Sequence, residues 1–353
     1  MNNLDFLLAL IILVHIQWGY TTQAHDNAAI TKTSSTRILK KQPIMRRMMI
    51  AMLPCIMASV YFFGWRSLFI VLTACIFAFG TEYIFARQRG EPVTEAVFVS
   101  AIIYALIMPP TIPWHVLIFG MVFAIMFGKM VFGGFGCNVF NPAMVGRAFV
   151  YICFPVALTA MWSPAAQGIW GALGTWSTGL NPDAITAATP LALVKAGEAA
   201  SPALTDLLLG RIAGTMGVTS ALAIIIGGLY VFITKTANRV IIITVVLTYI
   251  LVNGIFALLR VMGSPGVLPA LLGGGFLFGA FFMATDPVSA PKTKGGRVIY
   301  SAVIAVLTAV IRNFSVFNGG FMFSLLIANM FAPILDYAFK HRRRKAETRE
   351  STG

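Results

Sequence analysis

The chain has 353 residues, of which 58% are hydrophobic and only 11% are charged, and its formal net charge is +14. A soluble protein has about 25% charged residues, so the composition excludes an ordinary soluble domain. Apolar runs of about 20 residues recur, which indicates membrane helices and excludes the short alternating segments of a transmembrane β-barrel. The cations are spread over loops, so we expect no nucleic-acid partner.

The first apolar stretch, residues 6–20, is short, and no cation precedes it. A secretory signal peptide has a positively charged region before its apolar core. We therefore expect residues 1–44 to form an N-terminal cytoplasmic extension. The rest of the chain predicts an all-α polytopic membrane protein with about ten transmembrane helices. The predicted spans are 46–64, 67–86, 95–109, 113–132, 142–160, 215–234, 239–259, 267–284, 298–313 and 319–339.

These spans divide into two five-helix membrane repeats, 45–160 and 215–340, joined by a loop at 161–214 and followed by a basic tail at 341–353. Each half contains a glycine-rich interruption and a proline-terminated polar motif. An odd number of spans in each repeat gives the two repeats opposite topologies. Inverted repeats place a functional site near the membrane midplane, at broken helices.

The charges orient this topology. With both termini in the cytoplasm, most of the 26 lysines and arginines fall on the inner side, as the positive-inside rule requires. The cations left outside are Arg66, Lys195, Arg211, Arg260 and Arg312. The loop 161–214 then lies on the outer face of a cell inner membrane, and the basic tail lies in the cytoplasm.

The first polar motif is "GGFGCNVFNPA" at 133–143, which contains Asn138 and Asn141. Backbone that leaves a helix at membrane depth must be buried in protein or line a cavity. Asparagine side chains both donate and accept hydrogen bonds, which suits a polar ring such as a flavin isoalloxazine. The alternative is a cytosolic re-entrant loop in which asparagine only caps a helix.

Acidic side chains near apolar spans are the second signal. Glu95, Asp286 and Asp336 are candidates for an ion path, because intramembrane acids are costly and hard cations prefer oxygen ligands. Glu82, at the end of the second span, is a further acid of this kind. Each candidate also has a structural alternative. Asp286 could cap a helix before Pro287, Glu95 could be a first-turn acid, and Asp336 could pair with nearby cations.

The outer loop contains "DAITAATPLA" at 183–192. Its polar residues are Asp183, Thr186 and Thr189. The residues alone favour a helix that begins at Pro190 with Thr189 as its N-cap. An exposed hydroxyl in a segment of small residues would equally suit covalent attachment of a group.

Several motifs, in order, resemble the NqrB/RnfD family. They are "FGGFGCNVFNPAMVGRAF", "DAITAATPLA", "GAFFMATDPVSAP" and "NMFAPILDY", and the resemblance covers about residues 45–340. It implies that FMN is joined through its phosphate to Thr189 by a separate flavin transferase on the outer face. Asp183 and Thr186 match transferase-recognition positions, and Ala188 is the small residue before the acceptor.

The resemblance also implies a noncovalent riboflavin in the membrane part, with Asn138 and Asn141 at its site. Gly133 and Gly134 match a region tied to quinone or inhibitor binding. Glu95, Asp286 and Asp336 match positions implicated in sodium uptake.

Two branches of the family fit different motifs. The length, "TAATPLALVK" and "YFFG…TEYIF…PVT" resemble the D subunit of the Rnf complex, which links ferredoxin and NAD. In contrast, "MRRMM", "PPTIP" and "ATDPVSAP" resemble the B subunit of the sodium-pumping NADH:quinone reductase. We favour the Rnf branch.

We therefore expect a flavin-carrying, ion-translocating electron-transport subunit that moves Na⁺ or H⁺. It would be inactive without its partner subunits, because no dinucleotide fingerprint is present. The alternatives are a non-redox channel or transporter with inverted repeats, and an assembly scaffold.

Overall fold

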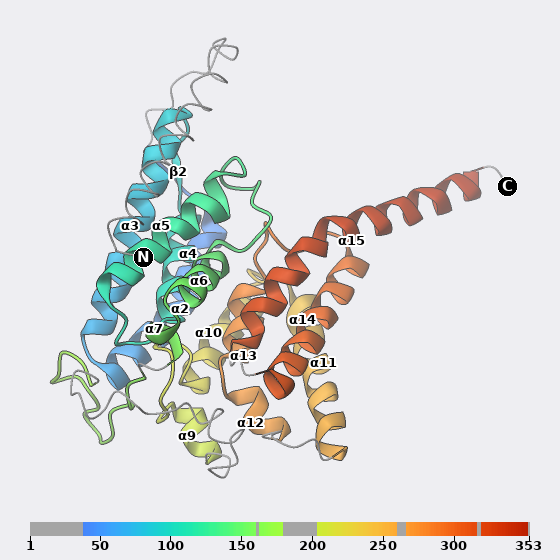
Figure 1. Cartoon of the computed structure of the whole chain (residues 1–353). Helices are drawn as coiled ribbons and strands as arrows, with labels where there is room; N and C mark the ends of the chain where they lie inside the picture. Colours follow the sequence, from blue (N-terminus) through green and yellow to red (C-terminus); the bar gives the residue numbers. More distant parts are fainter. Residues whose placement is uncertain (1–37, 160–161, 179–202, 260–265, 316–318, 352–353) are drawn as a thin grey trace. The chain divides into compact units, whose positions relative to one another are not determined.

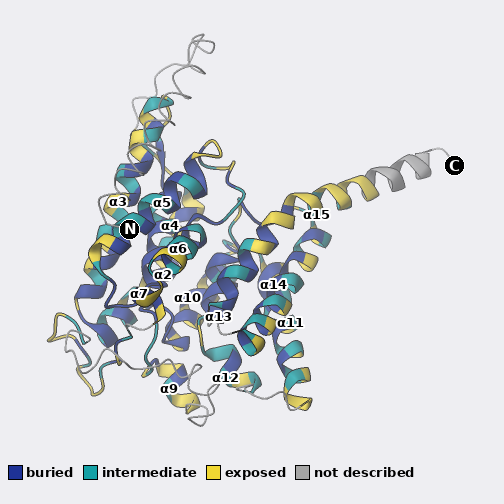
Figure 2. Cartoon of the chain, viewed as in Figure 1, coloured by how far each residue is buried: buried dark blue, intermediate teal, exposed yellow. Residues whose placement is uncertain are grey.

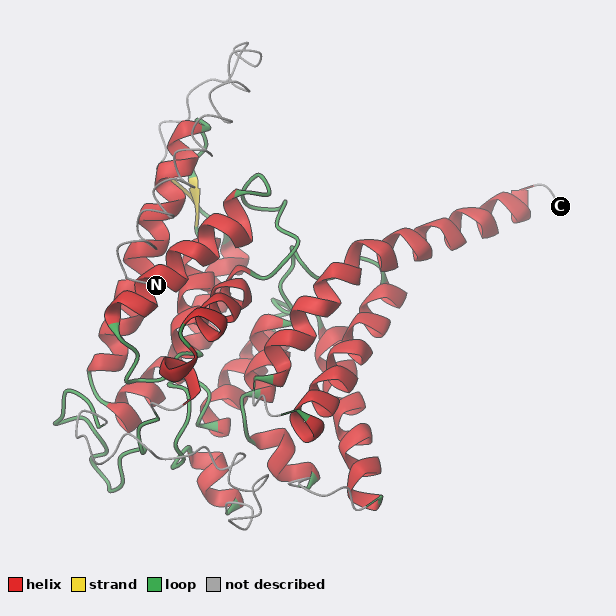
Figure 3. Ribbon diagram, viewed as in Figure 1, coloured by secondary structure: helices red, strands yellow, loops and turns green. Residues whose placement is uncertain are grey.

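The computed structural model describes residues 38–159, 162–178, 203–259, 266–315 and 319–351, with side chains of the last helix described to residue 342. All of them except Ile38 belong to one compact unit, Leu39–Gly353. This unit is built almost entirely of helices (Figures 1 and 3). The fold class predicted from the sequence, a helical membrane protein, is confirmed at this level.

The first half begins with a helix that proline starts and glycine ends. Pro43 occupies the first turn of α2, where its missing N–H is not needed, and Gly64, with φ +91°, ends that helix. Two short parallel strands pair Leu39 with Val93 beside it. The elements are β1 (Leu39–Lys40), α2 (Pro43–Phe63), α3 (Arg66–Gln88), β2 (Val93–Thr94), α4 (Ala96–Leu106), α5 (Trp114–Ile125), the π-helix η1 (Met126–Met130), α6 (Pro142–Cys153) and α7 (Pro155–Thr159).

The second half uses polar caps. The side chains of Ser220, Asn238 and Thr293 each accept a hydrogen bond from a backbone N–H in the first turn of the helix that follows. The elements are α9 (Leu204–Leu209), α10 (Ala221–Ile233), α11 (Arg239–Leu258), α12 (Val267–Leu272), α13 (Phe276–Phe278), the π-helix η3 (Gly279–Met283), α14 (Lys294–Phe314) and α15 (Gly320–Ser351).

Five helices among the described residues are long and apolar enough to cross a membrane, namely α2, α3, α11, α14 and α15 as far as Arg342. The helices α4, α5 with η1, α6 and α10 are apolar but shorter. Ten full spans are therefore not confirmed.

Three predicted segments differ from the structure for identifiable reasons. The segment 267–284 is interrupted because Gly274 and Gly275 have positive φ, and 142–160 breaks before Pro155 because proline disrupts a continuing helix. The segment 215–234 becomes helical only at Ala221. The predicted basic tail, 341–353, follows on from α15, which stays helical as far as Ser351.

The two halves use corresponding contacts. In the first half α2 packs on α4, α3 on α5, and α5 on α6; in the second half α10 packs on α13 and η3, α11 on α14, and α14 on α15. Between the two halves, α2 packs on α10 and α6 packs on α15. The first helix of one half thus contacts the first helix of the other, and the same holds for the two fifth helices. A two-fold relation produces this pattern. The inverted repeat stays a prediction that these contacts support.

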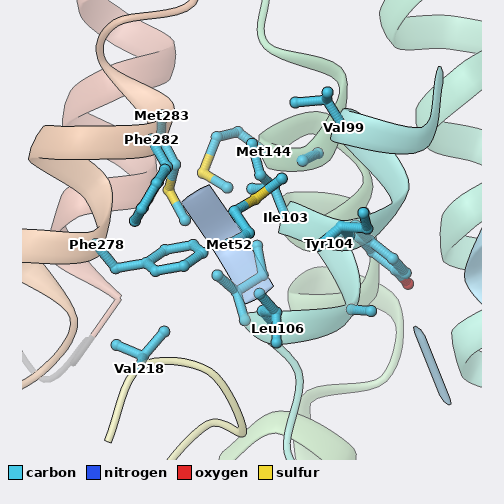
Figure 4. Packing of buried hydrophobic residues seen from close by; sticks show 14 of the residues in the cluster. Met52, Val99, Ile103, Tyr104, Leu106, Met144, Val218, Phe278, Phe282 and Met283 are labelled. Carbon is cyan, nitrogen blue, oxygen red and sulfur yellow. The ribbon is translucent and has the colours of Figure 1, made fainter. Parts of the chain in front are cut away.

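The core joins the halves. Met52 of α2, Ile103 of α4 and Met144 of α6 lie close to Phe278 and Phe282 of the broken segment (Figure 4). At Gly227, any larger residue would collide with the carbonyl of Ala51, so this glycine lets α10 approach α2 closely. The outward faces of α2, α3 and α11 are exposed and apolar, as lipid-facing helices are (Figure 2).

Candidate functional site

A pocket of about 590 Å³, including its open mouth, lies where the two halves meet. It brings together the two polar motifs that the sequence separates by more than a hundred residues. Its walls come from α2, α4, the η1–α6 connection, the α10–α11 connection and the segment after η3. Its polar lining residues are Ser100, Lys129, Asn138, Asn141, Thr236 and Asp286.

The first motif reaches the pocket through a glycine-rich loop. Gly133, Gly134 and Gly136 all have positive φ, which lets the chain turn sharply after η1 and return to Asn141. The Oδ1 atom of Asn141 accepts a hydrogen bond from the backbone N–H of Ala143 at 3.1 Å. The alternative function predicted for asparagine here, helix capping, is therefore confirmed at Asn141.

Asn141 also touches the other half, because its Nδ2 atom lies 3.4 Å from the carbonyl oxygen of Met283 at the end of η3. Asn138 is buried, and its Nδ2 atom donates to the carbonyl of Phe140 at 3.0 Å. Both asparagines line the pocket, and their role in binding a ring stays a prediction.

The second motif contributes Asp286. Its Oδ1 atom accepts from the backbone N–H of Val288 at 3.1 Å, and its Oδ2 atom accepts from the hydroxyl of Ser289 at 2.9 Å. These bonds form a local turn and not a helix cap, since the next helix, α14, begins only at Lys294. The residue also lines the pocket, and its role in an ion path stays a prediction.

Lys129 is a polar residue of the site that was not predicted from the sequence. Lys129, whose side chain is 2% exposed, places its Nζ atom 2.5 Å from Oε2 of Glu82 and 2.8 Å from the hydroxyl of Thr94. The other carboxylate oxygen of Glu82 accepts from the N–H and the hydroxyl of Thr94. The available signal was a lysine inside an apolar run, which usually marks function in a membrane protein.

Glu95 lies at the same end of the helices but outside the pocket. It precedes α4, and its carboxylate accepts from the Arg46 guanidinium at 2.6 and 2.9 Å and from the backbone N–H of Gln42 at 2.5 Å. The Arg46 hydrogen bond is the main cause that holds the pKa of Glu95 below its usual range, against the opposing effect of burial.

Asp336 is a helix cap supplied from another helix. From α15 its carboxylate accepts from the backbone N–H groups of Lys292 at 2.8 Å and Thr293 at 2.9 Å, and from the Thr293 hydroxyl at 2.7 Å. An anion at a helix N-terminus is favourable, so Asp336 stabilises the start of α14. It does not line the pocket, and of the three predicted ion-path acids only Asp286 does.

Gly133 and Gly134, predicted as a quinone or inhibitor region, lie in the loop next to Arg89. The Arg89 side chain donates to the carbonyl of Met130 at 2.5 Å and approaches Gly134. Neither glycine lines the pocket. Their role stays a prediction.

The predicted attachment motif lies outside the described residues. This applies to Thr189 and to Asp183, Thr186 and Ala188. Its assignment therefore continues to rest on the sequence.

The pocket combines apolar walls with a group of polar side chains. Met45, Met48, Val99, Ile103 and Phe282 supply apolar walls, and the amides and charges supply convergent polar groups. Ligand sites commonly combine apolar walls with a few convergent polar groups in this way.

Comparison with known proteins identifies relatives over most of the chain. The model of the NQR2, RnfD, RnfE family matches residues 32–345. The D subunit of the ion-translocating oxidoreductase complex of Alcanivorax borkumensis is 35% identical over 87% of this chain and 94% of its own length. Its counterpart in Aliivibrio salmonicida, with the same name, is 32% identical over 85% of this chain and 93% of its own length.

A second group of relatives is similar over a shorter region. The B subunit of the Na⁺-translocating NADH-quinone reductase of Ectopseudomonas mendocina is 39% identical over 72% of this chain, and the match spans 62% of that protein. The chain thus matches about three fifths of this relative's length. The family match and the first two relatives together cover both polar motifs and the pocket between them, and the chain belongs to the NQR2, RnfD, RnfE family.

Proposed function

We propose that this chain is the flavin-carrying membrane subunit of an ion-translocating electron-transport complex of the Rnf type. The observation that carries this proposal is the pocket where Asn138, Asn141 and Asp286 meet across the two halves. Relatives named as subunits of ion-translocating oxidoreductase complexes support the class. The match over more than nine tenths of these relatives, against 62% of the quinone reductase relative, favours the Rnf branch.

In this proposal the pocket holds a noncovalent riboflavin. Asn138 and Asn141 orient the polar edge of the ring, and the methionines and Phe282 pack on its faces. Lys129 provides a positive charge at the pocket wall, and this charge is paired with the carboxylate of Glu82. The flavin supplies the electron-transfer chemistry, while the protein sets its position and its electrostatic surroundings.

The second flavin is FMN, joined through its phosphate to Thr189. The motif around Thr189 and the positive-inside count support an attachment site on the outer face of the inner membrane, where a flavin transferase would act. Both termini are then cytoplasmic. Electrons enter and leave through partner subunits, because this chain has no dinucleotide fingerprint.

Flavin content tests both sites separately. The tagged chain is co-expressed with the transferase and its partner subunits. We expect in-gel flavin fluorescence after denaturation in the wild type, its loss in Thr189→Val, and its retention in a matched control, Thr178→Val. Fluorescence that persists in Thr189→Val would move the attachment elsewhere, and a dark wild type would contradict the covalent flavin.

Released flavin tests the pocket. Asn138→Leu should reduce the noncovalent flavin extracted from the purified complex several-fold and leave the covalent signal intact. Asn313→Leu, an asparagine outside this pocket, serves as the control. Equal noncovalent flavin in Asn138→Leu and in the wild type would show that the pocket has another occupant.

Ion coupling is a separate part of the proposal. Asp286 is the acid best positioned for it, because it faces the same pocket as Lys129. Asp286→Asn should weaken the sodium or pH dependence of turnover in the assembled complex, and Asp336→Asn should change it less, since Asp336 caps α14. The reverse order would contradict this assignment.

The corresponding membrane component of a Na⁺-translocating NADH-quinone reductase is the second candidate, favoured by the 39% identity. The two candidates differ in the electron donor. Reduced ferredoxin should support flavin reduction in an Rnf-type complex, whereas NADH with a quinone acceptor should support turnover in the alternative.

A further inference from the structure

Residues 162–178 form an uncharged loop, here called the aromatic strap. It follows α7 and lies against the turn between α2 and α3 (Figure 1, lower left). Four backbone hydrogen bonds attach it: Ala166 N–H to Phe62 O at 2.9 Å, Ala172 N–H to Tyr61 O at 2.7 Å, Trp65 N–H to Thr175 O at 3.4 Å, and Arg66 N–H to Trp176 O at 2.9 Å. The strap is thereby fixed to the ends of two candidate membrane spans.

Side chains add to this attachment. The Tyr61 hydroxyl donates to the carbonyls of Gly168 and Ile169 at 3.0 and 3.1 Å, and the Trp65 indole N–H donates to the carbonyl of Leu173 at 2.9 Å. The two ends of the strap are closed by the hydroxyls of Ser163 and Thr178, 2.7 Å apart. The strap is therefore a closed surface loop with many fixed points.

The tip of this loop displays two large apolar side chains. Ile169 is 91% exposed and Trp170 is 80% exposed. They lie between Gly168 and Gly171, both with positive φ, and a Cβ at Gly171 would collide with the carbonyl of Tyr61. The chain thus turns tightly around the end of α2 and directs an Ile–Trp pair away from the protein.

This exposed pair continues an apolar surface that belongs to the membrane helices. Trp176 of the strap packs against Phe69 of α3 with ring centroids 5.1 Å apart. Phe69, Leu72 and Ile76 are themselves exposed along α3, as lipid-facing residues are. The strap carries no charged residue, whereas a protein–protein interface usually has a polar and charged rim.

Tryptophans mark this end of the helices. In the described part of the chain they are Trp65, Trp114, Trp162, Trp170 and Trp176, and all lie in the strap, at the α2–α3 turn or beside Arg66 at the start of α3. Tryptophan concentrates at membrane–water interfaces, where its apolar ring faces the acyl chains and its N–H faces the headgroups. The level of the strap therefore matches the boundary of the bilayer.

We propose that Ile169 and Trp170 insert into the headgroup–acyl boundary of the phospholipid bilayer, so that the aromatic strap anchors this end of the protein in the membrane. The occupant of the exposed surface is phospholipid. The proposal is independent of flavin binding, since it depends only on the strap and the helices that hold it.

Depth-dependent fluorescence quenching tests whether Ile169 lies at the headgroup–acyl boundary. In a background with Cys137 and Cys153 replaced by serine, Ile169→Cys is labelled with the environment-sensitive fluorophore NBD, and the assembled complex is placed in phosphatidylcholine nanodiscs. Two control labels define the extremes: Ile76→Cys, which is exposed in the middle of α3, and Lys41→Cys, which is exposed at the other end of the helices.

We expect lipids with a nitroxide near the headgroup to quench the label at position 169 several-fold more than aqueous iodide does. The label at position 76 should respond best to a deep nitroxide, and the label at position 41 should respond to iodide alone. Iodide quenching at position 169 equal to that at position 41 would overturn the proposal. Protection from both quenchers would also overturn it, because the strap would then be covered by another protein of the complex.

Discussion

Buried charged residues have different partners at the two ends of the helices, the pocket end and the strap end. At the pocket end, the buried acids Glu82 and Glu95 each pair with a cation, Lys129 and Arg46 respectively. At the strap end, arginines are held by backbone carbonyls. Arg66 donates to the carbonyls of Pro110 and Ile112 at 2.7 and 2.6 Å, and Arg312 donates to the carbonyl of Gly274.

This difference suggests different roles. An ion pair can be rearranged, because either partner can exchange its counter-charge for a ligand or an ion. A guanidinium that is held by backbone carbonyls of a loop has no counter-charge to exchange. In the described residues neither Arg66 nor Arg312 has a carboxylate within ion-pair distance. The pocket end is therefore suited to changes of charge, and the strap end to holding the helices in place.

The largest expected effect lies in the buried pair. Lys129→Met leaves the Glu82 carboxylate without its cation in a buried site, and breaking such a pair costs about 3–5 kcal/mol. We expect a marked loss of thermal stability in detergent, measured by fluorescence-detected size-exclusion after heating.

The matched control for this variant is the double variant Lys129→Met/Glu82→Gln. It removes both charges, so it should recover much of the lost stability if pairing is the main contribution. A double variant that is at least as unstable as the sum of the two single variants would show that the two residues act independently.

Arg66 should behave differently. Arg66→Met removes both donors to Pro110 and Ile112, and each buried carbonyl left without a donor costs about 1–3 kcal/mol. No single neutralisation of an acid should rescue it, because no acid pairs with it in the described residues. The same heating assay applies, with Arg211→Met as the control. Rescue by any carboxylate-to-amide change would remove the contrast between the two ends.

A smaller effect is expected at Asp336. Asp336→Asn weakens a cap that serves two backbone N–H groups and one hydroxyl, and losing a cap typically costs about 1 kcal/mol. Slightly lower stability with unchanged sodium dependence would support a structural role. A sodium dependence that changes at unaltered stability would instead support the ion path.

The smallest effect concerns Glu95 and pH. Its pKa is lowered in the folded protein, so its contribution is present above the unfolded value of about 4.3 and is lost as the pH falls through the folded value. The difference in melting temperature between wild type and Glu95→Gln should therefore persist at pH 7 and 5 and shrink below about 4.3. A difference that grows on acidification would have the wrong sign.

The sequence predicted the helices best where apolar runs are uninterrupted. The span 239–259 corresponds to α11, Arg239–Leu258, almost residue for residue. The prediction failed at 267–284, because hydropathy does not register that Gly274 and Gly275 adopt positive φ.

The candidate site was predicted in its parts but not in its arrangement. Asn138, Asn141 and Asp286 were each identified from local motifs, and only the fold brings them to one pocket. Glu82 and Lys129 are 47 residues apart, so no local pattern indicates that they pair. Asp336 was identified as an intramembrane acid, but its contact with the start of α14 depends on helix packing.

The two π-helices have a consequence for how the family can vary in length. Each holds one residue more per turn than an α-helix, and each directly precedes a polar motif of the pocket. Deleting one residue from 126–130 or from 279–283 would turn the following chain by about 100°, the rotation of one α-helical residue. Asn141 and Asp286 would then leave the pocket, so single-residue deletions there should be absent from functional relatives while flanking loops tolerate them.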